Sequence, residues 1–163
     1  MLGLTVRAAK RSFFDREKVT RAVDRATHRV LSRFGAFVRT RARTSIRYRK
    51  KSSRPGAPPH GHRTMLRMKK DRKAGQKAQM VSPLREFIFF AYEESRKSVV
   101  IGPALLNARG GSQVLKSLEY GGPSVIFDGK KRKRVMIKAR PFMRPARDAE
   151  LPAFRRMLNN SVR

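Results

Sequence analysis

Two segments decide how the last third of the chain folds: Leu118-Glu119-Tyr120-Gly121-Gly122 and Ala139-Arg140-Pro141-Phe142-Met143-Arg144-Pro145-Ala146. In the second segment the two prolines hold the backbone extended and delay the final helix, while Phe142 and Met143 supply apolar anchors between them. This pattern predicts a joint between a strand and a helix. In the first segment a Glu-Tyr pair precedes two glycines, which predicts a sharp turn or a close approach by another backbone.

The composition indicates one strongly basic domain. The 163 residues, 39% of them apolar, suit a single core and a single domain over residues 1–163. The 41 lysines and arginines outnumber the 11 acids and give a formal net charge of +30. Because such self-repulsion destabilises a lone compact chain, we expect a polyanion or acidic proteins as neighbours. Nucleic-acid binders, ribosomal-type proteins and components of assemblies that touch nucleic acid all tolerate this balance.

The sequence also argues against cysteine chemistry, a membrane span and a signal peptide. The absence of cysteine excludes disulfides, thiolate catalysis and cysteine-bound zinc, and it is compatible with assembly in a reducing cytoplasm. No apolar run approaches the roughly 20 residues of a membrane span, so we expect no membrane association. The stretch from Met1 to Val6 is too short for a signal peptide, and we interpret it as a small strand.

A long amphipathic helix is predicted from Arg16 to about Ile46. Its apolar residues recur every three or four positions, and they are Val19, Val23, Ala26, Val30, Phe34 and Phe37. Either Ser12, in a capping box with Asp15, or Asp15 itself begins the helix. On a neighbouring face four arginines stand at four-residue intervals: Arg21, Arg25, Arg29 and Arg33. Because like charges at this spacing repel, we expect something negative to face them, and the alternative is a solvated basic face.

The next segment, residues 48–83, is predicted to be a basic arm or long loop. It contains Pro55-Gly56-Ala57-Pro58-Pro59 and then a run from Met65 to Lys77 with six basic residues and one acid. Its apolar content is too small to offset the entropy of fixing it. We therefore expect the arm to be mobile, or to be ordered by partners.

Two hairpins and two helices are predicted for the rest of the chain. Phe87–Tyr92 pairs with Ser98–Ile101, a short helix covers Gln113–Glu119, and Ser124–Phe127 pairs with Val135–Ala139 across an Asp-Gly turn. The tip of the second hairpin carries Lys130, Lys131, Arg132, Lys133 and Arg134, which either enter an anionic environment or form a solvated loop. A final helix covers Arg147–Asn160. The fold class is α+β, with a long N-terminal and a C-terminal helix covering one face of a small, mostly antiparallel sheet.

Candidate catalytic and metal residues are sparse. His60-Gly61-His62 lacks a third ligand, because the nearest acid, Asp71, lies in a basic run, and a surface position explains His28. The candidate magnesium ligands are scattered along the chain: Glu86, Glu93, Glu94, Glu119 and Asp128. Neither a Walker loop nor a Gly-x-Ser-x-Gly elbow is present. We therefore predict no enzyme, no metal and no cofactor, and any contact with DNA would be made through phosphates, without sequence preference.

The two opening segments resemble the neck or tail-completion family of long-tailed bacteriophages. Members of that family carry a Leu-Glu-Tyr/Phe-Gly turn followed by an Arg-Pro-Phe-(Met/Leu)-Arg-Pro-Ala entry into the last helix. Other segments resemble the family in the same order, namely Phe13-Phe14-Asp15, Gly35-Ala36-Phe37-Val38-Arg39, Ala42-Arg43-Thr44-Ser45-Ile46, Pro55-Gly56-Ala57-Pro58-Pro59-His60, Phe87-Ile88-Phe89-Phe90-Ala91-Tyr92 and Ser98-Val99-Val100-Ile101-Gly102-Pro103. One departure is Thr64-Met65-Leu66-Arg67, where the family has Thr-Gly-Leu-Leu/Arg; the basic stretch from there to Pro83 is interpreted as an insertion.

The resemblance implies a non-enzymatic virion protein at the head–tail junction, present in the host cytoplasm during assembly. Related folds there are commonly hexameric rings, which join the connector to tail terminator or tail tube proteins and let double-stranded DNA pass. The expected oligomer and partner contacts are Glu119, Tyr120, Gly121, Gly122, Arg140, Pro141, Phe142, Met143, Arg144 and Pro145. Contacts with DNA or acidic partners are expected at Arg21, Arg25, Arg29, Arg33 and Lys130 to Arg134. The alternative is a free, sequence-independent nucleic-acid-binding protein of ribosomal type.

Overall fold

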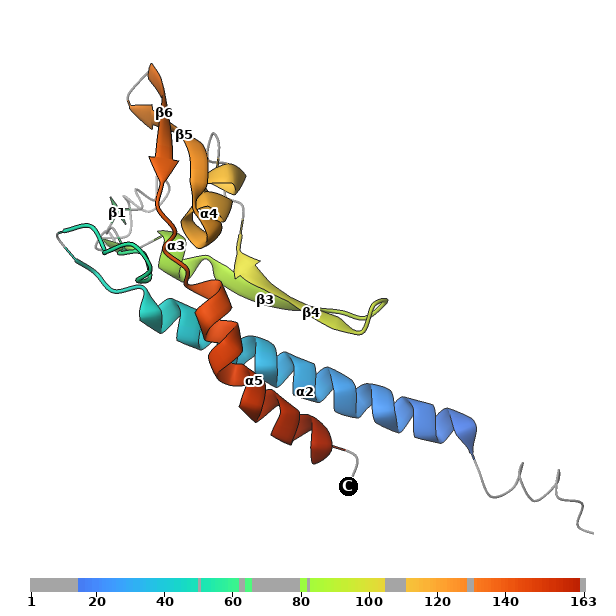
Figure 1. Cartoon of the computed structure of the whole chain (residues 1–163). Helices are drawn as coiled ribbons and strands as arrows, with labels where there is room; N and C mark the ends of the chain where they lie inside the picture. The colour runs from blue at the N-terminus through green and yellow to red at the C-terminus, as the bar shows by residue number, and fades with distance from the viewer. Residues whose placement is uncertain are drawn as a thin grey trace, which may run out of the picture.

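The computed structural model describes residues 15–49, 51–61, 64–65, 80–81, 83–104, 111–128 and 131–161. Within them the chain is an α+β fold (Figure 1). In chain order the elements are α2 (Arg16–Ser45), β1 (Thr64–Met65), β2 (Met80–Val81), α3 (Pro83–Glu86), β3 (Ile88–Glu93), β4 (Ser98–Pro103), α4 (Gly111–Tyr120), β5 (Gly122–Asp128), β6 (Lys131–Ile137) and α5 (Met143–Asn159). The predicted strand at 1–6 lies outside the described residues.

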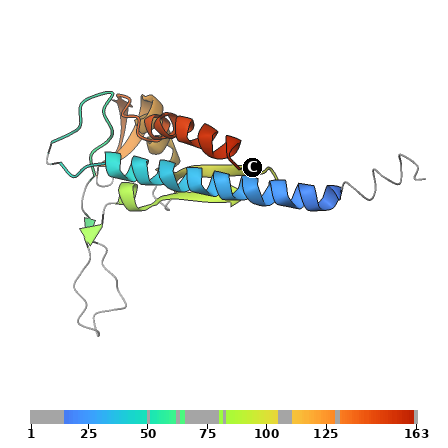
Figure 2. The same cartoon turned by 90° about the horizontal axis from the view of Figure 1, so that it is seen from below.

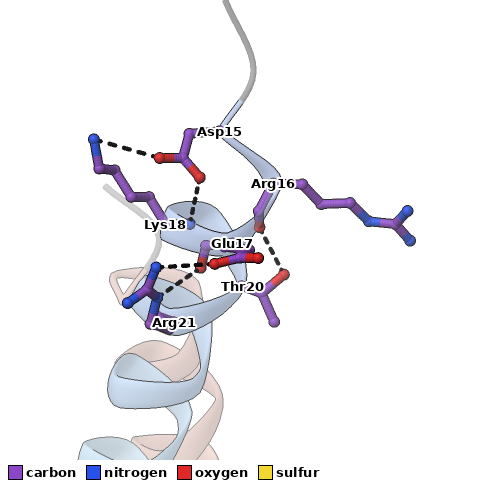
Figure 3. Close-up of polar contacts among 6 residues, drawn as sticks. All are labelled: Asp15, Arg16, Glu17, Lys18, Thr20 and Arg21. Atoms are coloured by element: carbon purple, nitrogen blue, oxygen red, sulfur yellow. Dashed lines mark hydrogen bonds and ion pairs between the residues drawn. The ribbon is translucent and has the colours of Figure 1, made fainter. Parts of the chain in front are cut away.

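The long helix begins where the sequence allows two alternatives, and Asp15 is the N-cap. Its carboxylate accepts the backbone N–H of Lys18 at 3.1 Å and also pairs with the Lys18 ammonium (Figure 3). This contact satisfies one of the four N–H groups that have no partner at a helix start. Ser12 lies outside the described residues. The helix ends at Ser45 and the chain continues in extended conformation from Ile46.

The core lies where α2 meets α5 and the β3–β4 hairpin. On one side the rings of Phe34 and Phe154 pack with their centroids 4.7 Å apart. On another side α2 lies against the hairpin, and the Arg39 guanidinium donates to the carbonyl of Ile88 at 2.8 Å. The buried core residues are Phe34, Val38, Ala42, Ile46, Ile88, Phe142 and Ala146. Figure 2 shows α2 as the axis along which the other elements are arranged.

The predicted apolar face of the helix is only partly buried. Val30 and Phe34 are buried, whereas Val19, Val23 and Phe37 are almost half exposed. For Val19 and Val23 the reason is the length of α5, which runs antiparallel to α2 and ends at Asn159, soon after Phe154 has packed on Phe34. The first turns of α2 therefore extend beyond α5, as Figure 1 shows.

The strands form three separate two-stranded hairpins in the described residues, not one sheet as predicted. β3 pairs with β4, as the hairpin predicted from Phe87–Tyr92 and Ser98–Ile101 requires, and Phe90 lies opposite Ile101. β5 pairs with β6, and the short pair β1–β2 has no counterpart in the sequence prediction. The hairpins stay apart because β3–β4 packs along α2, whereas β5–β6 packs against α4. The turn of β3–β4 is closed by Lys97, whose φ is positive.

The predicted position of the basic run in the second hairpin is wrong. The prediction began the second strand at Val135 and placed Lys130 to Arg134 in the tip. In the structure β6 begins at Lys131, which pairs with Asp128, so only positions 129 and 130 separate the paired residues. With only two connecting positions the ladder continues to Asp128 and Lys131, because its hydrogen bonds are made by the backbone and do not depend on the charge of the side chains. Four of the five basic residues therefore lie on a strand.

Two further predictions are corrected near the core. The final helix begins at Met143, four residues before the predicted start, because Pro145 falls in the first turn, where a proline lacks no hydrogen bond. Residues 51–61 of the predicted mobile arm are held by the chain itself. The Gly56 N–H donates to the carbonyl of Ala139 at 2.8 Å, and the Gly61 N–H donates to the carbonyl of Arg47 at 3.0 Å.

Gly35 permits the close packing of α2 on the first hairpin. A Cβ atom at this position would lie 2.7 Å from the Phe90 ring and 2.9 Å from a Val99 methyl group. Replacing Gly35 with alanine raises the free energy of unfolding by about 1 kcal/mol through helix propensity, but the overpacking that the new methyl group causes lowers it by about 1–3 kcal/mol. We expect Gly35→Ala to lower the free energy of unfolding by about 1 kcal/mol in urea denaturation. Gly102→Ala is the control, because no atom of the residues that the structure describes lies within 4 Å of its Cβ position. An unchanged stability in Gly35→Ala contradicts the prediction.

Candidate interaction site

The carboxylate of Glu119 connects the two segments that decide the fold. Its Oε2 accepts the backbone N–H groups of Phe142 at 3.0 Å and Met143 at 3.2 Å, and its Oε1 accepts that of Arg144 at 2.7 Å. These are the N-cap and the first two positions of α5. A negative charge at a helix N-terminus is further stabilised by the helix dipole. Glu119 therefore caps α5 from a distant part of the chain.

Pro145 completes this arrangement. It is the third residue of α5 and has no N–H, so the first four backbone positions from Phe142 leave no unpaired donor. We name the contact between Glu119 and the α5 N-terminus the carboxylate cap. Neither segment can form it alone, because the carboxylate belongs to one and the donors belong to the other.

The glycine pair after Glu119 lets the two segments approach. Gly121 has φ of +78°, a conformation that favours glycine, and a Cβ there would lie 3.2 Å from the backbone nitrogen of Ala139. The Arg140 N–H donates to the carbonyl of Leu118 at 2.6 Å. The Arg140 side chain in turn donates to the carbonyl of Ser53 at 3.1 Å and so fixes the proline-rich loop. The predicted turn and strand-to-helix joint are thus one structural unit.

A groove lies beside the carboxylate cap. Its volume is about 410 Å³, and its lining residues are Phe34, Val38, Val99, Ile101, Glu119, Tyr120, Met143, Arg144 and Arg147. The groove combines apolar side chains from α2 and β4 with arginines from the first turns of α5. Tyr120 is 73% exposed. A large exposed aromatic residue beside apolar surface and arginines is typical of protein interaction sites.

The predicted partner-contact residues therefore divide into two groups. Glu119 is engaged by the carboxylate cap, and Phe142 is 2% exposed in the core. Gly121, Gly122, Arg140 and Pro141 shape the joint and are half-buried. Tyr120, Arg144 and Pro145 are exposed, and Met143 is half-buried at the groove. Sequence reasoning missed the groove residues Val99 and Arg147, because only the fold brings β4 and α5 together.

The arginine stripe of α2 forms a second candidate surface. Arg21 pairs with Glu17 at 3.2 Å (Figure 3), whereas Arg25, Arg29 and Arg33 have no acidic partner among the described residues. These three line a groove of about 590 Å³ together with Asp24, His28, Ser32, Tyr92, Glu94 and Lys97. The rings of His28 and Tyr92 meet edge to face at 4.4 Å. The Lys97 ammonium donates a hydrogen bond to the Asp24 carboxylate across this groove. This bond raises the pKa of Lys97, and desolvation lowers it by a smaller amount.

The second predicted basic set lies elsewhere. Arg132, Lys133 and Arg134 are exposed on β6, Lys131 begins that strand, and Lys130 lies outside the described residues. Figures 1 and 2 place β6 near the C-terminal end of α2, away from the first turns of that helix. The structure therefore does not bring the two basic sets together.

The acids do not gather into a catalytic or metal site in the part of the chain that the structure describes. There, no group of three His, Cys, Asp or Glu residues could hold a metal ion. Glu86 pairs with Arg43, Glu93 with Arg96 and Glu119 with the α5 N-terminus. None of the described helices has the length and apolar character needed to cross a membrane.

Comparisons with protein-family models, with curated proteins and with solved structures gave no significant match.

The carboxylate cap predicts a specific loss of stability. Glu119→Ala leaves three backbone N–H groups at the start of α5 without their acceptor, and hydrogen bonds to a charged group contribute about 1.5–3 kcal/mol. We expect the free energy of unfolding to fall by about 2–3 kcal/mol in urea denaturation followed by circular dichroism. Glu94→Ala removes the same charge from an exposed site and is the matched control. Equal stabilities of the two variants would contradict the role of the cap.

The arginine stripe predicts a measurable electrostatic effect. If Arg25 and Arg29 contact phosphates, Arg25→Gln with Arg29→Gln should lower the slope of log affinity for duplex DNA against log salt by about 2. Fluorescence anisotropy with a labelled duplex over a range of salt concentrations measures that slope. Arg155→Gln with Arg156→Gln removes the same charge from exposed positions of α5 and should change the slope less. Identical slopes for both double variants would leave the stripe as a solvated face.

Proposed function

We propose that this protein is a non-enzymatic structural subunit of a bacteriophage head–tail junction. It acts as a neck or tail-completion protein, located in the virion neck and present in the host cytoplasm before assembly. It forms a ring, with six copies as the expected number, between the connector and the tail terminator or tail tube proteins. Double-stranded DNA passes through the lumen of that ring.

The carboxylate cap is the observation that carries this proposal. The resemblance to the neck family is strongest in the two segments at 118–122 and 139–146, and Glu119 joins these two segments. Their side chains thus have a shared structural role, and the same joint lies beside the groove with exposed Tyr120. A motif that builds a fixed joint next to an interaction groove suits an assembly protein better than an enzyme.

The distribution of charge supports assembly in a larger particle. Among the described residues, eight acids have partners within the chain: Asp15, Glu17, Asp24, Glu86, Glu93, Glu119, Asp148 and Glu150. Most of the 41 basic residues are left to be neutralised from outside. Phosphates in a lumen, or acidic faces of adjoining rings, would offset the repulsion between subunits.

The groove beside the cap fits one kind of occupant. Its apolar floor favours an apolar side chain, and Arg144 and Arg147 favour a carboxylate next to it. The chain itself has few acids to supply, and most are engaged. We therefore assign the groove to an acidic and apolar segment of a neighbouring junction protein.

The second candidate function is free, sequence-independent binding of nucleic acid, as in ribosomal-type proteins. The groove lined by Arg25, Arg29 and Arg33 favours it, because these guanidinium groups lack acidic partners among the described residues. Four helical residues span about 6 Å of axis, so the stripe presents charges at regular intervals to a polyanion. This function requires no oligomer.

Light scattering after size-exclusion chromatography separates the two functions. We expect discrete oligomers, seen as rings in electron micrographs, alone or with co-expressed connector and tail proteins, and antibody labelling at the neck of purified particles. Tyr120→Ala should weaken co-assembly at unchanged stability, whereas Met136→Ala, which trims an equally exposed residue, should not. A monomer under all these conditions that binds DNA with steep salt dependence would favour the second function.

A further inference from the structure

Two arginines follow α2 on one face of an extended segment. Ile46 is buried and Tyr48 is half-buried, whereas Arg47 and Arg49 between and after them are exposed. Alternate residues of an extended chain point to the same side, so the two guanidinium groups share that side. Tyr48 is bridged to Gly61 in parallel orientation, which fixes the segment against the proline-rich loop.

The proline-rich loop beside these arginines is tied at both ends. Its end is held by the bond from the Gly61 N–H to the carbonyl of Arg47, and its beginning by the bond from the Gly56 N–H to the carbonyl of Ala139. Gly56 has φ of +79°, and Pro59 is buried. A loop that is tied at both ends and contains three prolines presents its side chains with little loss of entropy on binding.

A pocket of about 250 Å³ lies between the loop and the segment, lined by Ser45, Arg47, Arg49, Ala57, Pro58, Pro59 and His60. No described lining residue is acidic. The two prolines that line the pocket have no N–H to donate. The two arginines supply its charged hydrogen-bond donors. The Nδ1 atom of His60 accepts the Ser53 N–H at 3.4 Å, which orients the imidazole ring that lines the pocket.

The electrostatics of this pocket differ from those of the preceding helix turns. Arg41 pairs with Glu150 and Arg43 pairs with Glu86, but Arg47 and Arg49 have no acidic partner among the described residues. Two like charges about 7 Å apart repel by about 0.6 kcal/mol in water and by more at lower dielectric. An anion between them removes this repulsion.

We propose that this pocket binds a phosphate group. Two guanidinium forks that approach from different backbone positions match a tetrahedral oxyanion, which offers oxygens in more than one plane, better than a flat carboxylate. The pocket gives the Pro55–Gly61 motif a binding role that the assembly proposal does not use. The phosphate comes either from a nucleic-acid backbone or from free phosphate, and the two sources are separable.

Titration of the full-length protein with inorganic phosphate tests the proposal. We expect saturable broadening of the phosphate ³¹P resonance with one site per chain, and a shift of the His60 imidazole signals. Arg47→Gln with Arg49→Gln should abolish both, whereas the control Arg155→Gln with Arg156→Gln, equal in charge, should retain them. Circular dichroism checks that both variants are folded. Equal phosphate binding by the two variants, or an unmoved His60 signal, would overturn the proposal.

A second titration identifies the source. If a 12-base-pair duplex without terminal phosphates displaces inorganic phosphate, and the Arg47→Gln, Arg49→Gln variant loses more duplex affinity than the control, the pocket takes backbone phosphates. If the duplex leaves phosphate bound, the pocket takes a free phosphate. Neither result depends on ring formation, so a failure of this proposal and a failure of the assembly proposal are distinguishable.

Discussion

The carboxylate cap is the constraint on which the other contacts depend. A helix N-terminus that packs partly against other elements needs acceptors for its backbone N–H groups, and here one carboxylate accepts three of them while Pro145 removes a fourth. The cap fixes where α5 begins. The start of α5 then determines which residues reach α2, and it places Phe142 and Ala146 in the core. From the same joint Arg140 fixes the proline-rich loop, so the loop and the core share one anchor.

The scarcity of acids makes this anchor specific. With 11 acids against 41 basic residues, each carboxylate has many possible partners, and a cap built on Glu119 excludes it from a surface ion pair. The other engaged acids act in a similar way. Glu86 and Glu150 pair with arginines on the last turns of α2 and tie α3 and α5 to that helix. The paired acids thus hold neighbouring elements together, whereas the unpaired basic residues determine which charged partners the surface attracts.

The sequence predicted which helices and strands form better than it predicted where they begin and end. Periodicity predicted α2, and short apolar runs with turn signals predicted both large hairpins, because these patterns are local; α4 was also predicted. The start of α5 was wrong, since a proline in a first turn resembles a helix breaker until its capping carboxylate is known. The predicted position of the basic run in the hairpin tip was wrong. Consecutive charged residues suggest a loop, but the hydrogen bonds that pair β5 with β6 are made by the backbone. The single sheet was wrong and the groove was missed, because both depend on how β4, α4 and α5 meet in space.

The position of α2 explains why the candidate surfaces can act together. Its 30 residues span about 45 Å, with the arginine stripe along the first half and the Arg47–Arg49 pocket just beyond its C-terminal end. The groove beside the carboxylate cap lies between them and is lined by Phe34 and Val38 of the same helix. A rigid helix keeps these sites at constant separation. A polyanion bound at the stripe and a protein bound at the groove would therefore be held in a defined relative position, which is the requirement for a subunit that lines a passage and joins its neighbours.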